Sequence, residues 1–242
     1  MSLINDYLKK QEENSKVRVP NEYYVTELCG ECLLSSYYNI KYDIPPDERL
    51  LRIFETGGIL ENWWVNNVLR NTPGTTVIAT QLPARVKAKD HEIHGRIDAL
   101  SIRDNRMTVH EVKTARTSSW KNAPNEEHSN QISFYLHALG VVEGEIDVID
   151  KTILLLGEDP RNPKLAPDKI FHVYMNDGTY QRYLKILDNA EKLHAAITTD
   201  VMPKPTPCWR CQGGIKYCDH IDRCLKDYPP PPASPEAAPA AS

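Results

Sequence analysis

The sequence lacks several features that would assign the protein to a common class. Residues 1–10 contain no positive segment followed by an apolar run, so we expect no signal peptide. No stretch approaches ~18 uninterrupted apolar residues, so no transmembrane helix is expected. A basic excess is also missing, because the formal net charge is −4, which argues against a non-specific DNA coat protein. We therefore expect a cytoplasmic protein that does not enter the membrane.

Length and composition fit one large domain. The chain has 242 residues, and its hydrophobic content of 40% supports a real core. Residues 1–22 are polar and are expected to form a loosely held tail. Residues 229–242 are rich in Pro, Ala and Ser, and they cannot bury enough apolar surface to offset the entropy of ordering. We expect a single domain over residues 23–228 with a disordered tail after it.

Hydrophobic patterning predicts an alternation of helices and strands. The helices are expected over residues 23–38, 48–69, 126–140 and 179–197. The strands are expected over residues 77–80, 84–89, 92–102, 107–114, 152–156 and 169–175. Asp104-Asn105 predicts a tight hairpin that places the third and fourth of these strands beside each other.

Acidic residues lie on both strands of that hairpin. Asp98 ends the run Gly95-Arg96-Ile97-Asp98, and Glu111-Val112-Lys113 follows on the second strand. Because side chains alternate along a strand, Glu111 and Lys113 project to one side while Val112 points to the core. Asp98, Glu111 and the Val112 carbonyl oxygen would then ligate Mg²⁺ or Mn²⁺. Lys113 would orient the attacking water or stabilise charge on a phosphate, so the pattern predicts metal-dependent cutting of DNA.

The next helix and the loop before it carry groups suited to contact with nucleic acid. Gln131 and Tyr135 are spaced i, i+4, and His128 lies on the same side of the helix. An amide and a phenol can hold a phosphate oxygen or a displaced strand. In the loop, Arg116 can meet a phosphate and Trp120 can stack on a base of a single strand. Each of these residues, taken alone, also suits an ordinary surface or core position.

In this order and spacing the motifs resemble the RecB-like branch of the PD-(D/E)XK nuclease superfamily. The motifs concerned are Gly95–Asp98, Glu111-Val112-Lys113-Thr114 and His128-x2-Gln131-x3-Tyr135. They are most similar to the CRISPR-associated and phage-encoded RecB-like exonucleases, over roughly residues 23–226. Such enzymes act in CRISPR systems or in phage DNA recombination.

The resemblance implies an α/β fold with an αβββαβ core, in which a central mixed sheet is flanked by helices. It implies a deoxyribonuclease, an exonuclease acting on single-stranded DNA or DNA ends, with other DNA-processing proteins as possible partners. One position departs from the family, which usually has a histidine on the helix before the strands, where this chain has Glu61. By resemblance, Glu61 would join the metal ligands. The alternative is a DNA- or partner-binding module of the same fold that does not cut.

Six cysteines lie near the two ends of the domain, and without a secretion signal they favour metal or cluster ligation over disulfides. The pairs Cys29-x2-Cys32 and Cys208-x2-Cys211 match tetrahedral zinc. The RecB-like exonucleases instead often hold a [4Fe-4S] cluster with one N-terminal and three C-terminal cysteines. By that resemblance, which we favour, the ligands would be Cys32 and three of Cys208, Cys211, Cys218 and Cys224. Spacing alone does not choose between the two centres, and either would tie the chain ends together.

Overall fold

The computed structural model describes residues 7, 8, 10, 18–42, 48–115, 123–151, 154, 168–206, 218 and 220–228. The helices are α2 (Val25–Leu28), α3 (Leu33–Tyr42), α4 (Glu48–Asn67), α5 (Glu126–Leu139), α7 (Asp177–Thr199) and α9 (Ile221–Asp227), with a 3₁₀ turn η1 (Leu69–Asn71). The strands are β1 (Glu22–Tyr24), β2 (Thr75–Lys87), β3 (Glu92–Arg103), β4 (Arg106–Ala115), β5 (Glu143–Asp150) and β6 (Asp168–Tyr174). None of the helices in these ranges combines the length and the apolar character needed to cross a membrane.

The strands form one mixed sheet in which β3 has the most neighbours. β2 runs antiparallel along the whole of β3. Because a strand has two edges, β1 and β4 share the other edge of β3, where β1 is parallel to it and β4 antiparallel. β4 then pairs parallel with β5, and β5 pairs antiparallel with β6. The order α4-β2-β3-β4-α5-β5 confirms the predicted αβββαβ core and the α/β fold.

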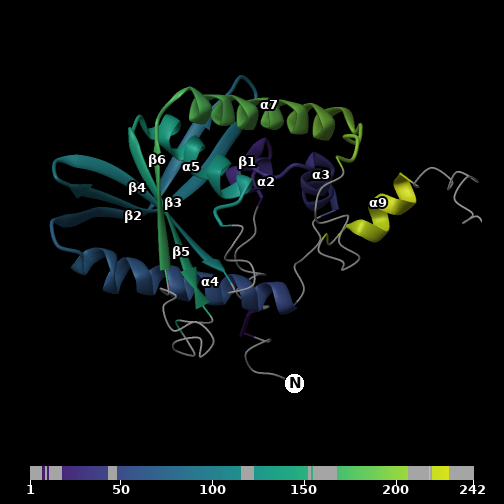
Figure 1. Ribbon diagram of the computed structural model, residues 1–242. Helices are drawn as coiled ribbons and strands as arrows, with labels where there is room; N and C mark the ends of the chain where they lie inside the picture. The colour runs from purple at the N-terminus through teal and green to yellow at the C-terminus, as the bar shows by residue number, and fades with distance from the viewer. Residues whose placement is uncertain are drawn as a thin grey trace, which may run out of the picture.

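Helices cover both faces of the sheet (Figure 1). α4 lies on one face, and α5 and α7 lie on the other. The larger hydrophobic cluster is on the α5–α7 side and includes Ile97, Ile132 and Ile146. A smaller cluster on the α4 side joins Trp64 to Val112. The inner strands β3, β4 and β5 are therefore largely buried on both faces, whereas β2 and β6 are more exposed, so polar residues in the inner strands need specific partners.

Local sequence signals correctly predicted the hairpin and the helix after it. Asp104 and Asn105 have φ values of 51° and 59°, as a two-residue turn between twisted strands requires. α5 begins after Asn125, whose side chain accepts the backbone N–H of His128. It ends at Gly140, which has a left-handed backbone that costs glycine nothing.

One predicted element was wrong, and another lies mostly outside the described residues. The helix expected over residues 23–38 is divided into β1, α2 and α3, because β1 pairs with the distant strand β3. The strand expected over residues 152–156 lies mostly outside the described residues, and β5 is found just before it. β5 reads as polar, but its acidic side chains are buried: Asp147 lies 3.2 Å from His110 Nδ1 and Glu145 lies 3.3 Å from the same atom. Partners on other strands thus permit acids in a central strand.

Candidate active site

The strand β3 has a gap in its pairing on the edge that it shares with β1 and β4. β1 pairs with residues 92–94 and β4 pairs with residues 99–103. The segment Gly95–Asp98 between them has no strand partner on this edge within the described part of the chain. Backbone N–H and C=O groups that are not paired with a neighbouring strand need other hydrogen-bond partners. Side chains supply them here, and those side chains build the site.

Asp98 fills the end of the gap next to β4. Its Oδ2 accepts a hydrogen bond from the backbone N–H of Val112 at 2.7 Å. The register that pairs Ala99 with His110, continued by one residue, places Asp98 opposite Glu111. Asp98 is buried, and this burial, followed by the charges of Glu111 and Glu61, raises its pKa well above the ordinary value. The structure therefore brings the two acidic residues of the hairpin together.

Glu111 and Lys113 lie on one face of β4 and contact each other. Lys113 Nζ donates a hydrogen bond to Glu111 Oε1, whereas the buried Glu111 Oε2 accepts none from the described residues. Burial raises the pKa of Glu111, although the Lys113 ammonium opposes this shift. Burial lowers the pKa of Lys113, but the Glu111 and Asp98 carboxylates outweigh it, so its pKa is raised. An ammonium and a carboxylate oxygen without a hydrogen-bond donor thus stand side by side.

A third carboxylate reaches the site from the other layer. Glu61 on α4 is partly buried, and its Oε1 accepts a hydrogen bond from Gln81 Nε2. Its charge contributes to the raised pKa of both Asp98 and Glu111, so it lies close to both. Gln81 lies between two residue pairs of the β2–β3 ladder, at the level of Asp98, and has a left-handed φ of 53°. Gln81 could not be predicted from the sequence, because a single glutamine in a strand carries no pattern.

The side chains of this cluster are of the kind that binds a divalent cation with oxygen ligands, although their ligand atoms do not all lie within 4.8 Å of one another and would have to move closer to share one ion. Glu61, Asp98 and Glu111 supply carboxylates, and among the described residues one ammonium, that of Lys113, accompanies them in this cluster. Bringing like charges together without water raises the pKa of a carboxylate, and a cation between them would reverse that effect. Mg²⁺ and Mn²⁺ accept such oxygen donors and keep some water. The contribution expected of the Val112 carbonyl oxygen stays a prediction.

Comparison with known protein families agrees with this geometry. Residues 52–225 match the PD-(D/E)XK nuclease superfamily. The chain belongs to this superfamily. The matched part contains Glu61, Asp98, Glu111 and Lys113, and membership supports a nuclease activity. Among curated proteins, no sequence matches the chain.

Solved structures show the same superfamily fold at low identity. SSO0001 is 20% identical, with a TM-score of 0.58 over 95% of this chain and 97% of that chain. LHK-Exo, an alkaline exonuclease from Laribacter hongkongensis, is 14% identical, with a TM-score of 0.50 over 74% of this chain and 91% of that chain. At these identities the likeness concerns the fold alone. The arrangement of helices and strands is therefore shared with these two structures.

Gln131 and Tyr135 on α5 are buried against the unpaired segment of β3. Gln131 Nε2 donates to Tyr135 Oη at 2.9 Å, and Tyr135 Oη donates to the Arg96 carbonyl oxygen at 3.2 Å. Tyr135 is only 1% exposed. Its hydroxyl provides a hydrogen-bond donor to the unpaired edge of β3 and has little access to substrate. The structure thus places both residues as supports of the Gly95–Asp98 segment, whereas the sequence suggested that they face the substrate.

Close packing in the gap predicts a large effect for a small substitution. A Cβ added at Gly95 would overlap the Tyr135 ring and would lie 3.1 Å from Val25 Cγ1. We expect Gly95→Ala to lower the free energy of unfolding by about 1–3 kcal/mol, the usual range for overpacking. Gly58→Ala on α4 is the control, since no atom lies within 4 Å of its added Cβ and alanine favours a helix. Chemical denaturation measures both, and equal stability of the two variants would contradict the packing argument.

Of the remaining residues that were predicted to contact DNA, the structure describes only His128. His128 is in the first turn of α5 and is partly buried. Burial, together with the nearby Lys113 charge, lowers the pKa of His128 to about 4, so its ring is neutral at pH 7. A neutral ring can donate or accept one hydrogen bond but does not attract phosphate by charge. Arg116 and Trp120 lie outside the described residues.

The described cysteines divide into two environments. Cys32, Cys218 and Cys224 line one cavity of about 190 Å³ between α3 and the C-terminal segment. Cys29 is buried elsewhere in the core, where desolvation raises the pKa of its thiol. Cys208 and Cys211 lie outside the described residues. The two ends of the chain therefore meet around Cys32, as both expected centres require, while Cys29 does not line that cavity.

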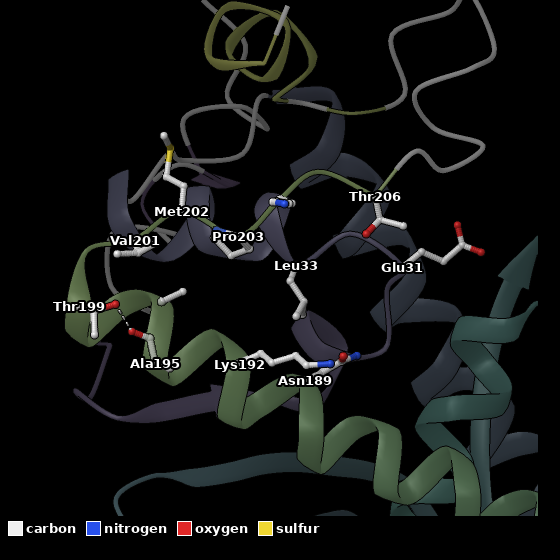
Figure 2. Close-up of a pocket in the computed structure, with 12 residues that line it drawn as sticks. Glu31, Leu33, Asn189, Lys192, Ala195, Thr199, Val201, Met202, Pro203 and Thr206 are labelled. Carbon is white, nitrogen blue, oxygen red and sulfur yellow. Dashed lines mark hydrogen bonds between the residues drawn. The ribbon is translucent and has the colours of Figure 1, made fainter. Parts of the chain in front are cut away.

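A wider hollow of about 540 Å³ adjoins the cysteine cavity (Figure 2). It lies between the last turns of α7, the start of α3 and the segment after α7, and Thr206 lines both cavities. Lys192 and Lys204 are among its lining residues. None of the predicted catalytic residues lines it, so the nuclease site and this hollow are separate features.

Proposed function

We propose that this protein is a Mg²⁺- or Mn²⁺-dependent deoxyribonuclease of the RecB-like branch, an exonuclease that acts on single-stranded DNA or DNA ends. The meeting of Asp98, Glu111 and Lys113 at the gap in β3 carries the proposal. A binding module would have no need for buried carboxylates whose ionisation is opposed by burial and mutual repulsion.

In the proposed mechanism, Asp98 and Glu111 would hold the ion, with Glu61 as a further ligand. A bound divalent ion supplies Lewis-acid activation of a phosphodiester and of water. The Lys113 ammonium is positioned by Glu111 and stabilises negative charge that develops on the phosphate oxygens. Gln81 fixes the Glu61 carboxylate through its amide. These groups sit on four elements of a packed core, α4, β2, β3 and β4, which limits their movement during the reaction.

Two observations favour an exonuclease that engages DNA ends or single strands. LHK-Exo, which shares the fold, is an alkaline exonuclease. In the sequence, Arg116 and Trp120 follow shortly after Lys113, and we propose that they contact a phosphate and a base. His128 would add a neutral hydrogen-bonding group beside Lys113. A net charge of −4 means that binding depends on local groups of this kind.

Degradation of labelled DNA tests the proposal. With Mg²⁺ or Mn²⁺, we expect linear DNA labelled at one end to release mononucleotides or short products from a terminus, and covalently closed circles to stay intact. Chelation by EDTA should stop the reaction. Cutting of circles at a rate similar to linear DNA would contradict the exonuclease assignment. Tight binding of DNA without cleavage in any divalent ion would show the non-cutting alternative instead.

For the cysteines we propose a [4Fe-4S] cluster held by Cys32 and C-terminal cysteines, of which Cys218 and Cys224 line the same cavity. Thiolate ligands suit both a zinc ion and an iron–sulfur cluster, and the cavity leaves Cys29 out of the group. Zinc through Cys29 and Cys32 is disfavoured because Cys29 lies in the core.

Substitution of the N-terminal cysteines distinguishes a [4Fe-4S] cluster from a zinc ion. We expect Cys32→Ser to remove the visible absorbance and the iron of protein purified without oxygen. Cys29→Ser, the matched control three residues away, should keep both. Elemental analysis and absorbance spectra give the answer. Colourless wild-type protein containing one zinc ion, lost equally in both variants, would overturn the cluster and support the C-x2-C pairs.

A further inference from the structure

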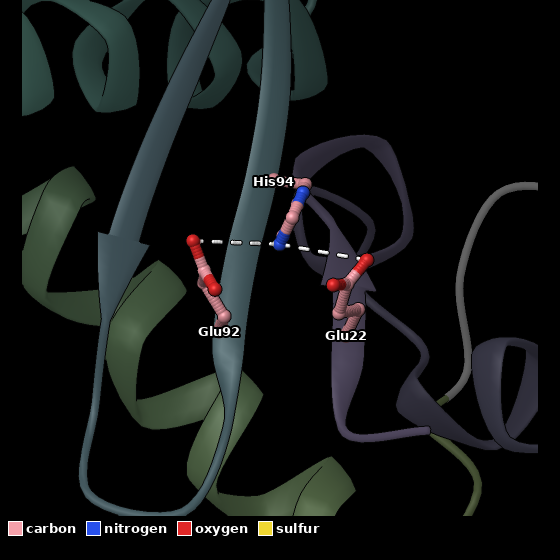
Figure 3. Close-up of side chains that lie close together, drawn as sticks. All are labelled: Glu22, Glu92 and His94. Carbon is pink, nitrogen blue, oxygen red and sulfur yellow. Dashed lines mark ion pairs between the residues drawn. The ribbon is translucent and has the colours of Figure 1, made fainter. Parts of the chain in front are cut away.

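A second group of metal-ligating side chains lies at the edge of the sheet, away from the nuclease site. Glu22 on β1 and Glu92 on β3 are register partners in the parallel pair, and His94 follows on the same face of β3 (Figure 3). His94 Nε2 points between the two carboxylates, at 3.6 Å from Glu22 Oε2 and 3.6 Å from Glu92 Oε1. The three ligand atoms all lie within 4.8 Å of one another.

This arrangement is unfavourable without a cation. Like charges directly opposite each other on neighbouring strands destabilise a sheet. The distances to His94 are too long for hydrogen bonds, and its Nε2 is buried without a hydrogen-bond donor or acceptor among the described residues. Lys87 and Arg85 are the β2 register partners of Glu92 and His94, yet neither forms an ion pair with the glutamates in the described part of the chain. Within the described residues, His94 is the one side chain that forms ion pairs with the two glutamates, and only when its ring is protonated.

A divalent transition-metal ion would relieve each of these features. Zinc binds histidine nitrogen and carboxylate oxygen at about 2.0–2.2 Å, so two ligand atoms at a tetrahedral angle lie about 3.4 Å apart. The observed separations of 3.6 Å need only small side-chain movements to reach that value. The glutamate side chains are 28% and 31% exposed, which leaves the site open to solvent for entry and for a water ligand. An imidazole ligand favours zinc over magnesium.

We propose that Glu22, Glu92 and His94 bind a Zn²⁺-type ion that fastens β1 to β3. β1 has only three residues, and it leads directly into α2 and the turn that carries Cys32. The ion would therefore hold the N-terminal segment at β1, whereas the cysteine cavity holds the same segment at Cys32. This site is distinct from the nuclease centre, because residues 92–94 and Asp98 lie on opposite sides of the gap in β3.

Zinc titration in matched variants tests the site. The starting protein carries Glu111→Gln, so that the nuclease centre is weakened equally in every sample. We expect this protein to bind one more Zn²⁺ per chain, by equilibrium dialysis and elemental analysis, than the same protein with added Glu92→Gln or His94→Gln. Glu191→Gln, an exposed glutamate on α7, is the control and should leave the count unchanged. Since all samples share the same cysteines, zinc bound there cancels in the comparison.

Thermal stability gives a second readout that does not depend on the count. Zn²⁺ should raise the Tm of the starting protein by several degrees more than that of the Glu92→Gln variant. Without metal, Glu92→Gln should be at least as stable as the starting protein, because it removes one of two facing charges. Equal zinc counts in the starting protein and both variants would overturn the proposal. So would a metal-free Glu92→Gln protein of lower Tm, since that would show that the two carboxylates are already compensated.

Discussion

Lys113→Ala is expected to slow DNA cleavage by about 10²–10³-fold at saturating Mg²⁺ or Mn²⁺, the usual cost of losing one group that stabilises transition-state charge. The ammonium of Lys113 is held by Glu111 and lies among carboxylates that would bind the ion. A water molecule in its place cannot supply a fixed positive charge to the phosphate. Single-turnover kinetics on end-labelled DNA measures the chemical step, since product release does not enter.

The loss must be separated from unfolding, because Glu111 is buried and Lys113 is its hydrogen-bonding partner. Circular dichroism at the assay temperature gives the folded fraction, and the rate is scaled to it. Lys87→Ala removes an exposed lysine from β2 and serves as the matched control, with a rate within about twofold of wild type. A Lys113→Ala protein that is folded and cuts at the wild-type rate would exclude Lys113 from the reaction.

Asp98→Asn is expected to abolish cleavage and yet to stabilise the protein in the absence of metal. Burial and the charges of Glu111 and Glu61 raise the pKa of Asp98, so its ionised form is costly in the folded state. Asparagine keeps an oxygen that can accept the Val112 N–H but carries no charge. We expect a gain at neutral pH on the order of 1 kcal/mol in the free energy of unfolding, a typical size for a single substitution.

The pH dependence of stability follows from the same shift. A carboxyl group with a raised pKa binds its proton more tightly in the folded chain than in the unfolded chain. Its stabilising contribution is therefore complete below the unfolded pKa of about 3.9 and is lost as the pH rises through the folded pKa of Asp98. We expect the metal-free wild-type protein to lose stability over that range, and Asp98→Asn to lose less. Urea denaturation at a series of pH values measures the difference.

Added metal should reverse the order of stability, so that wild type becomes more stable than Asp98→Asn. A ligand that binds only the folded state stabilises it in proportion to the logarithm of its concentration above Kd. Added Mn²⁺ should therefore raise the Tm of wild type and have little effect on Asp98→Asn. Asp90→Asn, at an exposed turn, is the control and should respond to Mn²⁺ as wild type does. If Asp98→Asn were less stable than wild type at every pH without metal, the proposed repulsion at this site would be wrong.

Some of the site could be read from the chain because the signals are local. Alternation along one strand is enough to place Glu111 and Lys113 on the same face. The Asp104-Asn105 turn fixes the neighbouring strand and so brings Asp98 to the level of Glu111. Other parts depend on contacts between distant segments. Glu61 was suggested only by resemblance, and Gln81 was not suggested at all, because its role arises where β2 passes under α4.

The order from α4 to α5, the face shared by the motif residues and the superfamily to which they point could all be read from the chain alone. Long-range packing was needed to show that β1 and β4 leave Gly95–Asp98 unpaired, and that Tyr135 completes this edge of β3. It also decided that Cys32, and not Cys29, meets the C-terminal cysteines. The reason is physical: side-chain direction follows from a residue's immediate neighbours, whereas burial and unpaired backbone groups depend on which distant strands and helices come to lie beside them.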